Sequence, residues 1–145
     1  MKTKIDKAKS RLVLSHPFFS SILLGCKVVE DSTLSPPTMA TDGTTIWYHP
    51  GVELLWSVDE CIGVLAHEVM HIVCLHPWRR GSRDQRKANR AMDYAINHVL
   101  ETSGFTLPKG RLREAEYDGK CFEVIYSMLK DPPPKQGEGQ GEGQG

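Results

Sequence analysis

A five-residue segment, His67-Glu68-Val69-Met70-His71, has the residue types and the spacing of a metal site. On a helix, side chains at positions i and i+4 share one face, so the two imidazoles can bind a single Zn²⁺ ion. Glu68 would lie near the open side of that ion, where it could act as general base and take a proton from the attacking water. The segment therefore predicts metal-dependent hydrolysis.

The predicted helix around this segment is apolar on all sides. From Cys61 to Leu75 it reads CIGVLAHEVMHIVCL, and Glu68 is its only formally charged residue. A helix of this kind is buried, and a buried carboxylate is costly unless something compensates its charge. A metal ion on the two histidines would compensate it. The alternative is a pair of core histidines and a glutamate paired with Arg79 or Arg90.

A catalytic zinc site needs a third protein ligand. The metzincin pattern is excluded, because Cys74 and Pro77 stand where that pattern has glycine and histidine. His76 lies on the opposite side of the helix from His67, so it could bind only if the helix breaks before it. The other source is the next helix, as in gluzincins.

The next helix, predicted over about residues 83–101, offers an acid among small and apolar neighbours. Asp93 lies on a polar line with Asn89 and Asn97, beside an apolar stripe. We predict Asp93 as the third ligand, because His98 and Glu101 point in other directions on the helix. The apolar stripe consists of Ala88, Met92, Ala95 and Val99.

Other roles for these polar residues stay open. Asp93 could instead accept hydrogen bonds from the two histidines without touching the ion, and Asn97 could orient a ligand or pack between helices. A hydrolase also needs a donor for the developing oxyanion. The residue types allow four donors, among which the sequence does not choose: Tyr94, His76, Tyr48 and His98.

Several of these motifs together resemble a known family. The chain is similar to the predicted zinc metallopeptidase domain that often precedes a von Willebrand A-like domain in bacterial and phage proteins. The likeness runs from Pro17-Phe18 to about Asp131. It implies a gluzincin-like α+β domain with zinc on His67, His71 and an acid equivalent to Asp93. The motifs that carry it are Ala40-Thr41-Asp42-Gly43, Leu65 to His71, Ala91 to Asn97, and His76 followed by Arg79-Arg80.

Local patterns predict an α+β fold in which a small, mainly antiparallel sheet packs on the HExxH helix and the ligand helix. Asp42-Gly43 between two β-branched and aromatic runs predicts a hairpin. Capping boxes at Ser57-x-x-Glu60 and Ser82-x-x-Gln85 mark helix starts, and Pro77 marks a stop. The expected helices span residues 5–14, 17–24, 58–76, 83–101 and 122–129, and the expected strands span residues 26–30, 38–41 and 44–48.

Two further features bear on ligands. The strand just before the metal helix is predicted to pair with an extended peptide substrate; its residues are Thr44, Thr45, Ile46, Trp47 and Tyr48. A basic cluster occupies residues 79–90, which is most simply a solvated helix start but could meet an acidic substrate or nucleic acid. The whole chain is neutral, with 18 Lys+Arg against 18 Asp+Glu, so a general nucleic-acid binder is not expected.

The 145 residues predict one domain over residues 1–131 and a Pro/Gly/Glu/Gln-rich tail or linker over residues 132–145. No apolar run is long enough for a membrane span, and no secretory signal is seen. The four cysteines form no CxxC pair. These features predict a reduced, cytoplasmic protein without a membrane partner.

The predicted function is that of a zinc-dependent metallopeptidase that cleaves a peptide or protein substrate, with Glu68 as general base. The alternative is an inactive, zinc-stabilised module that binds a protein or nucleic acid. A von Willebrand A-like domain or a separate protein could be a further partner. A water at the fourth metal position would favour the enzyme, and a fourth protein ligand such as His76 would favour the module.

Overall fold

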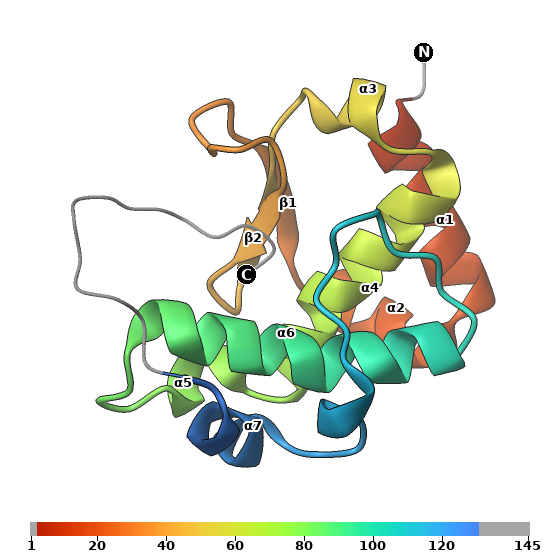
Figure 1. Ribbon diagram of the computed structural model, residues 1–145. Helices are drawn as coiled ribbons and strands as arrows, with labels where there is room; N and C mark the ends of the chain where they lie inside the picture. The colour runs from red at the N-terminus through yellow and green to blue at the C-terminus, as the bar shows by residue number, and fades with distance from the viewer. Residues whose placement is uncertain (1–2, 131–145) are drawn as a thin grey trace.

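Helices and one small sheet make up the part of the chain that the computed structural model describes, residues 3–130 (Figure 1). This mixture confirms the predicted α+β class. The predicted tail of residues 132–145 and the boundary at residue 131 lie outside the described residues. In chain order the elements are α1 Lys4–Ser15, α2 Pro17–Leu23, β1 Lys27–Glu30, β2 Met39–Thr41, β3 Thr45–Tyr48, α3 Val52–Leu55, α4 Val58–Val73, α5 His76–Arg79, α6 Gln85–Thr102, the 3₁₀ turn η1 Ala115–Tyr117 and α7 Phe122–Met128.

The sheet has the strand order β1-β3-β2. β2 and β3 form the predicted antiparallel hairpin, whereas β1 pairs with β3 in parallel. The expectation of a mainly antiparallel sheet is therefore corrected to a mixed one. After β1, the loop of residues 31–38 leaves room for one strand between β1 and β2. The turn after β2 then brings β3 into this central place, where it pairs with β1 on one side and with β2 on the other.

The central place of β3 corrects the prediction that residues 44–48 pair with a substrate. Residues 45–48 pair with β1 on one side and residues 46–48 pair with β2 on the other, so the backbone of this strand already has both neighbours. Within the described part of the chain, β2 has only β3 beside it. An extended peptide could therefore join the sheet at β2.

The helix α4 begins where the sequence predicts. The Ser57 hydroxyl accepts a hydrogen bond from the Glu60 backbone N–H at 3.1 Å, and the Glu60 carboxylate accepts one from the Ser57 N–H at 2.9 Å. This capping box satisfies two N–H groups that the helix itself leaves without partners. The helix then buries nine of its sixteen residues, including the whole segment from Val64 to Val69.

The end of α4 differs from the prediction. The helix stops at Val73 instead of continuing to His76. Leu75 takes a left-handed conformation with φ of 59°, and His76 opens the short helix α5. Pro77 lies in the first turn of α5, where its missing N–H costs nothing. The break before His76 frees this side chain from the helical direction assumed in the sequence analysis.

The start and the buried face of α6 also differ in detail. Its N-cap is Asp84, whose carboxylate accepts from the Lys87 backbone N–H at 2.9 Å, so the predicted capping box at Ser82 and Gln85 is wrong. The expected apolar stripe ends at Val99, which is 42% exposed. Ala88 and Met92 of that stripe are buried as predicted, and α6 also buries Ala91, Ile96 and Leu100.

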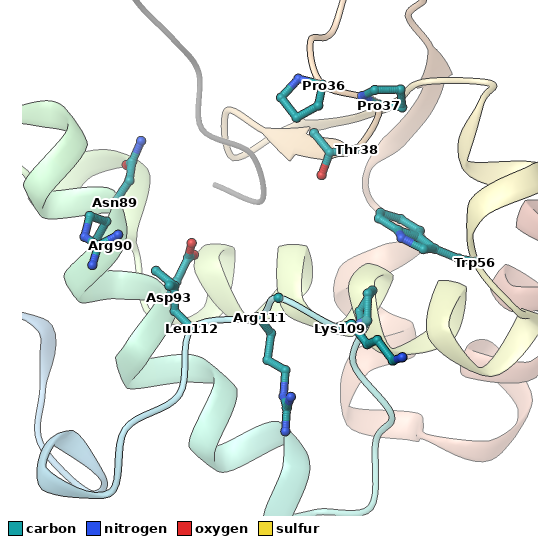
Figure 2. A pocket seen from close by; sticks show the side chains of 12 residues that line it. Pro36, Pro37, Thr38, Trp56, Asn89, Arg90, Asp93, Lys109, Arg111 and Leu112 are labelled. Atoms are coloured by element: carbon teal, nitrogen blue, oxygen red, sulfur yellow. The ribbon is translucent and has the colours of Figure 1, made fainter.

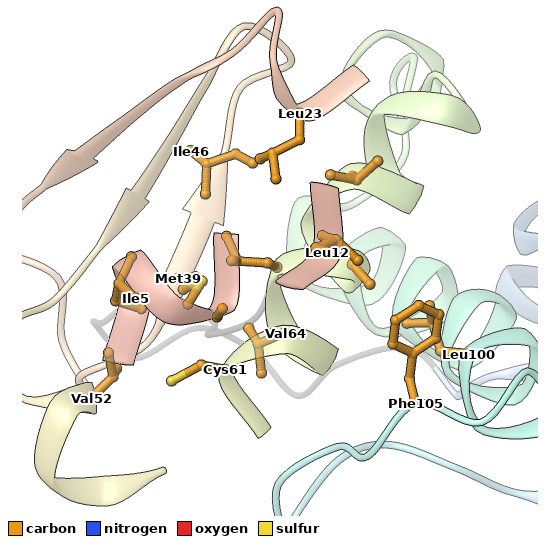
Figure 3. Close-up of a cluster of buried hydrophobic side chains, with 14 of the residues drawn as sticks. Ile5, Leu12, Leu23, Met39, Ile46, Val52, Cys61, Val64, Leu100 and Phe105 are labelled. Atoms are coloured by element: carbon orange, nitrogen blue, oxygen red, sulfur yellow. The ribbon is translucent and has the colours of Figure 1, made fainter. Parts of the chain in front are cut away.

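The main core gathers apolar side chains from α1, α2, the sheet, α4 and the end of α6 (Figure 3). Ile5 and Leu12 bring α1 against α4, and Met39 and Ile46 bring in the sheet. A smaller core between α6 and α7 is built around Phe122. The helix with the HExxH segment is thus held between the sheet and α1, while α6 crosses it (Figure 1).

Gly63 on α4 is a point of very close approach. A Cβ at this position would lie 1.9 Å from the backbone oxygen of Thr106 and 2.9 Å from its carbonyl carbon. Both atoms belong to backbone, which cannot rotate away as a side chain can. The absence of a side chain at Gly63 therefore lets the segment after α6 lie directly on α4, and that segment leads to Leu112, which supports the metal ligands.

We expect Gly63→Ala to lower the free energy of unfolding by about 3 kcal/mol or more, because the backbone at Thr106 must move. Denaturant unfolding measures this change. Gly25→Ala is the matched control: its added Cβ would meet the Ile22 oxygen at an ordinary 3.5 Å, so the change should stay within about 0.5 kcal/mol. Equal stabilities of the two variants would contradict the close packing at Gly63.

Among the helices of residues 3–130, none combines the length and the apolar character needed to cross a membrane.

Candidate metal centre

Three buried side chains from two helices converge on one point. His67 and His71 come from α4, and Asp93 comes from α6. The two Nε2 atoms are 3.0 Å apart, and Asp93 Oδ1 lies 3.1 Å from each of them. The three atoms thus form a nearly equilateral triangle. This brings together the three residues predicted as ligands, although they are up to 26 residues apart in the chain.

The chemistry and spacing of this triangle fit a divalent ion. Imidazole nitrogen and carboxylate oxygen are ordinary zinc ligands at about 2.0–2.2 Å, which places neighbouring tetrahedral ligand atoms about 3.4 Å apart. The observed spacing is close to that value. Two buried carboxylates, Asp93 and Glu68, also need positive charge nearby. The residues present therefore fit a zinc ion on the open side of the triangle.

Asn97 fixes the orientation of His67. Its amide Nδ2 donates to the Leu112 backbone oxygen at 3.0 Å, which turns its Oδ1 toward His67 Nδ1 at 2.8 Å. An amide oxygen can only accept, so the hydrogen on His67 lies on Nδ1 in this bond. Nε2 then faces the centre of the triangle, where a metal ion would take the place of the proton shared with Asp93.

The loop that supplies the Leu112 oxygen is tied to α6 on both sides of that residue. Arg111 and Arg113 donate to the Glu101 carboxylate, and Arg113 also donates to Asp118. These bonds lower the pKa of Glu101 against the opposing effect of its burial. The ion pairs hold Leu112 over Asn97 and thereby act on His67 from outside the metal site.

His76 contacts Nδ1 of His71 in the way that Asn97 contacts Nδ1 of His67. The Nδ1 atoms of His71 and His76 are 3.0 Å apart, on the side of His71 away from the triangle. Burial and the neighbouring His71 lower the pKa of His76 to about 3, so it is a neutral acceptor for the His71 Nδ1–H. Its ring packs edge-on against Phe122. His76 therefore orients a ligand, and the helix break at Leu75 makes this possible.

Charges within the site reinforce one another. Burial opposes protonation of His67, but its hydrogen bond to Asp93 and the Asp93 charge outweigh burial and raise the pKa of His67 to about 9. Burial would raise the pKa of Asp93, but its bonds with His67 and His71 lower it. Asp93 thus stays ionised in the interior because positive charge is beside it.

Glu68 is fully buried and differs from every other carboxylate in residues 3–130. Both of its oxygens are shielded from solvent and have no hydrogen-bond partner among the described residues. Burial raises the pKa of Glu68 well above its ordinary value, while the charge of His67 acts in the opposite direction. A carboxylate held this way is a strong proton acceptor next to the metal triangle.

The remaining candidates from the sequence lie elsewhere. Tyr94 packs in the core between α6 and α7, with its ring 4.7 Å from that of Tyr117. His98 contacts Asp118 and Arg113. Tyr48 is half-buried on β3 at the edge of the main core. The geometry therefore singles out no oxyanion donor among them.

The basic cluster of residues 79–90 is partly used within the fold. Arg79 pairs with Glu123, and its guanidinium lies 4.9 Å from the centre of the Phe122 ring. Arg83 lies over the same ring at 5.3 Å, and Lys87 lies 4.3 Å from the centre of the Tyr126 ring. These contacts attach α7 to the start of α6, which explains much of the cluster structurally.

Sequence reasoning missed the backbone oxygen of Leu112 and the wall residue Trp56, which lines a pocket that also contains Asp93. A backbone carbonyl leaves no mark in the residue types. Trp56 follows the short helix α3, which the sequence analysis did not predict. Its own carbonyl accepts a hydrogen bond from Lys4 Nζ at 2.8 Å.

We expect Asn97→Ala to weaken metal binding by about 10–100-fold, because His67 loses the group that orients it. Competition with a zinc-sensitive dye measures this change. Asn89→Ala, two turns earlier on the same helix, removes an amide that makes no hydrogen bond to another side chain in residues 3–130 and should leave the affinity within about twofold. Equal affinities of wild type and Asn97→Ala would show that Asn97 only packs between the helices.

A family model described as "Putative metallopeptidase domain" matches residues 1–145, the whole chain. No curated protein and no solved structure matches the chain. The family match confirms the resemblance to a metallopeptidase domain, whereas the association with a von Willebrand A-like domain stays a prediction.

Proposed function

Because the chain belongs to the putative metallopeptidase domain family, we propose that it is a zinc-dependent peptidase that hydrolyses peptide bonds. The single observation that carries this proposal is the juxtaposition of the His67, His71 and Asp93 triangle with the buried carboxylate of Glu68. A structural metal site has no use for a second, solvent-shielded carboxylate that accepts no hydrogen bond from the described residues. A hydrolytic site uses it as a base.

The roles follow from the geometry. His67, His71 and Asp93 would hold zinc, which would acidify a water at its open position and polarise the scissile carbonyl. Glu68 takes the proton of the attacking water and returns it to the leaving amine. Burial raises the pKa of Glu68, which makes its carboxylate a stronger proton acceptor than an exposed one.

For the substrate, we propose the edge strand β2 as the pairing partner. Met39–Thr41 has β3 on one side, and Thr38 just before it lines the pocket that contains Asp93. A peptide added to this edge would run past the metal triangle in extended form.

The inactive-module alternative is less well supported. It required a fourth protein ligand such as His76, but His76 contacts the outer nitrogen of His71. Within the described residues, the only cluster of potential ligand atoms is the triangle of two histidines and Asp93. A site with three protein ligands and an open position is the catalytic type.

Metal analysis and peptide cleavage together test the proposal. We expect about one zinc per chain, cleavage of an unstructured protein such as casein, loss of cleavage on chelation and its return on adding zinc. Two histidines and one carboxylate also bind iron(II) in oxygenases. Stoichiometric iron in place of zinc, or cleavage that survives complete metal removal, would contradict the proposal.

A further inference from the structure

A pocket of about 350 Å³ lies between two loops next to the metal triangle. Residues 36–38 form one wall and residues 108–112 form the opposite wall, while Asp93 lies on the floor (Figure 2). Trp56 lines the other end, where its indole faces the same space. The volume is at the small end of the range for ligand pockets and suits one or two residues of a peptide.

The charged residues around this pocket are almost all cationic. Arg90, Lys109 and Arg111 line it, and Asp93 is the only acid that does so. The negative charge of Asp93 is paired with His67 and His71. Arg111 is bound to Glu101 and points away from the pocket in Figure 2. Arg90 and Lys109 are exposed at opposite ends and have no ion-pair partner among residues 3–130.

Arg90 lies 5.9 Å from the centre of the Tyr94 ring, which does not neutralise its charge. Positive charge that no acid neutralises, beside a reacting centre, favours an anionic ligand. The surplus is local, because the chain as a whole has equal numbers of acidic and basic residues. Arg86, one helical turn before Arg90, is also exposed and has no ion pair in the described part of the chain. A substrate with carboxylates would therefore be attracted to this side of the metal site.

Resting on the proposed peptidase function, we infer that this pocket binds a carboxylate of the substrate close to the scissile bond, with Lys109 and Arg90 as the cations that attract it from the two ends of the pocket. The apolar wall of Trp56, Pro36 and Pro108 contacts the carbon atoms of the same residue. The enzyme then prefers acidic peptides. The carboxylate belongs either to an Asp or Glu side chain or to the C-terminus of the substrate.

A nucleic-acid phosphate is the less suitable anion here. A nucleic acid needs a continuous row of cations along its backbone. Three members of the basic cluster are instead in contact with α7: Arg79 with Glu123, Arg83 with Phe122 and Lys87 with the Tyr126 ring. The pocket lining also contains Pro36, Pro37 and Pro108, whose apolar surfaces suit a peptide.

The test measures binding to the zinc-loaded full chain with Glu68→Gln, so that no turnover is needed. The probes are blocked peptides of alanine and glycine that differ at one position, Glu, Gln or Lys, each with a free or an amidated C-terminus. Calorimetry gives the affinities. We expect the Glu peptide to bind about tenfold more tightly than the Gln peptide. A gain from the free C-terminus alone identifies that carboxylate as the ligand.

Charge reversal supplies the second arm. Lys109→Glu and Arg90→Glu should each reduce the preference for the carboxylate, whereas Lys7→Glu, at an exposed position of α1 outside the pocket, should retain it. Equal affinities for the Glu and Gln amides and for both C-termini would overturn the inference. So would displacement of the peptide by a short single-stranded DNA that binds more tightly.

These outcomes do not depend on whether the protein is a peptidase. A carboxylate preference in the binding assay, together with a wild-type protein that cleaves no peptide, supports the pocket assignment and refutes the catalytic one. Cleavage of neutral and acidic peptides at equal rates, with equal binding, does the reverse.

Discussion

Glu68→Gln is expected to lower kcat for peptide hydrolysis by roughly 10³–10⁴-fold while zinc and the fold are retained. The amide keeps the shape of the carboxylate but cannot accept the proton of the attacking water. Zinc should stay, because the three ligand atoms come from His67, His71 and Asp93. Single-turnover cleavage with parallel metal analysis measures both quantities.

Two observations make this prediction specific. Glu68 lies next to His67 in a helix whose face toward α6 is buried, and neither carboxylate oxygen is used by another group in residues 3–130. The substitution therefore removes chemistry and breaks no described hydrogen bond. Asp59→Asn, an exposed acid at the start of the same helix, is the control and should retain full activity. Turnover by Glu68→Gln near the wild-type rate would rule out its role as base.

Asp93→Ala is expected to weaken zinc binding by more than about 10³-fold, well beyond the 10–100-fold that loss of an orienting group costs. Asp93 Oδ1 is 3.1 Å from both histidine nitrogens and is the only carboxylate oxygen in the triangle. Without it, two neutral imidazoles must hold the ion alone. Dye competition and metal analysis on wild type and variant measure the change.

The size of this loss separates two roles for Asp93. A ligand gives the large effect, whereas a residue that only accepts hydrogen bonds from the histidines would give an effect similar to that of Asn97→Ala. Measured side by side, equal losses for the two variants would remove Asp93 from the ligand set. In the metal-stripped variant the pKa of His67 should also fall from about 9, because burial alone lowers it and Asp93 raises it. Titration of the imidazole signals by NMR gives this value.

The residues of the site could be predicted because their signals are local. The i, i+4 spacing of the two histidines and the apolar surroundings of Glu68 are properties of one helix. Asp93 was predicted from the next helix by the same argument, as a polar residue on a face that should be buried. The capping signals in the sequence were less dependable. The capping box predicted at Ser57 is present, whereas the N-cap of α6 is Asp84 and not Ser82.

Contacts between distant segments could not be predicted in this way. Which strand is central in the sheet depends on how the β2–β3 hairpin docks beside β1, so the sequence alone does not show that β3 has a neighbour on each side and that β1 and β2 are the edges. Likewise, the role of His76 depends on the left-handed backbone conformation of Leu75. A glycine at this position would have suggested that conformation in the sequence, but a leucine does not.

The sequence by itself determined the type of chemistry, since helical periodicity places two imidazoles and a carboxylate together whatever the rest of the chain does. Only the tertiary structure decided how that chemistry is held in position. The Leu112 oxygen, Asn97 and His67 belong to three separate segments, and Gly63 lets one of these segments lie on α4. Such contacts depend on packing in three dimensions, where backbone atoms count as much as side chains, and no residue pattern along the chain records them.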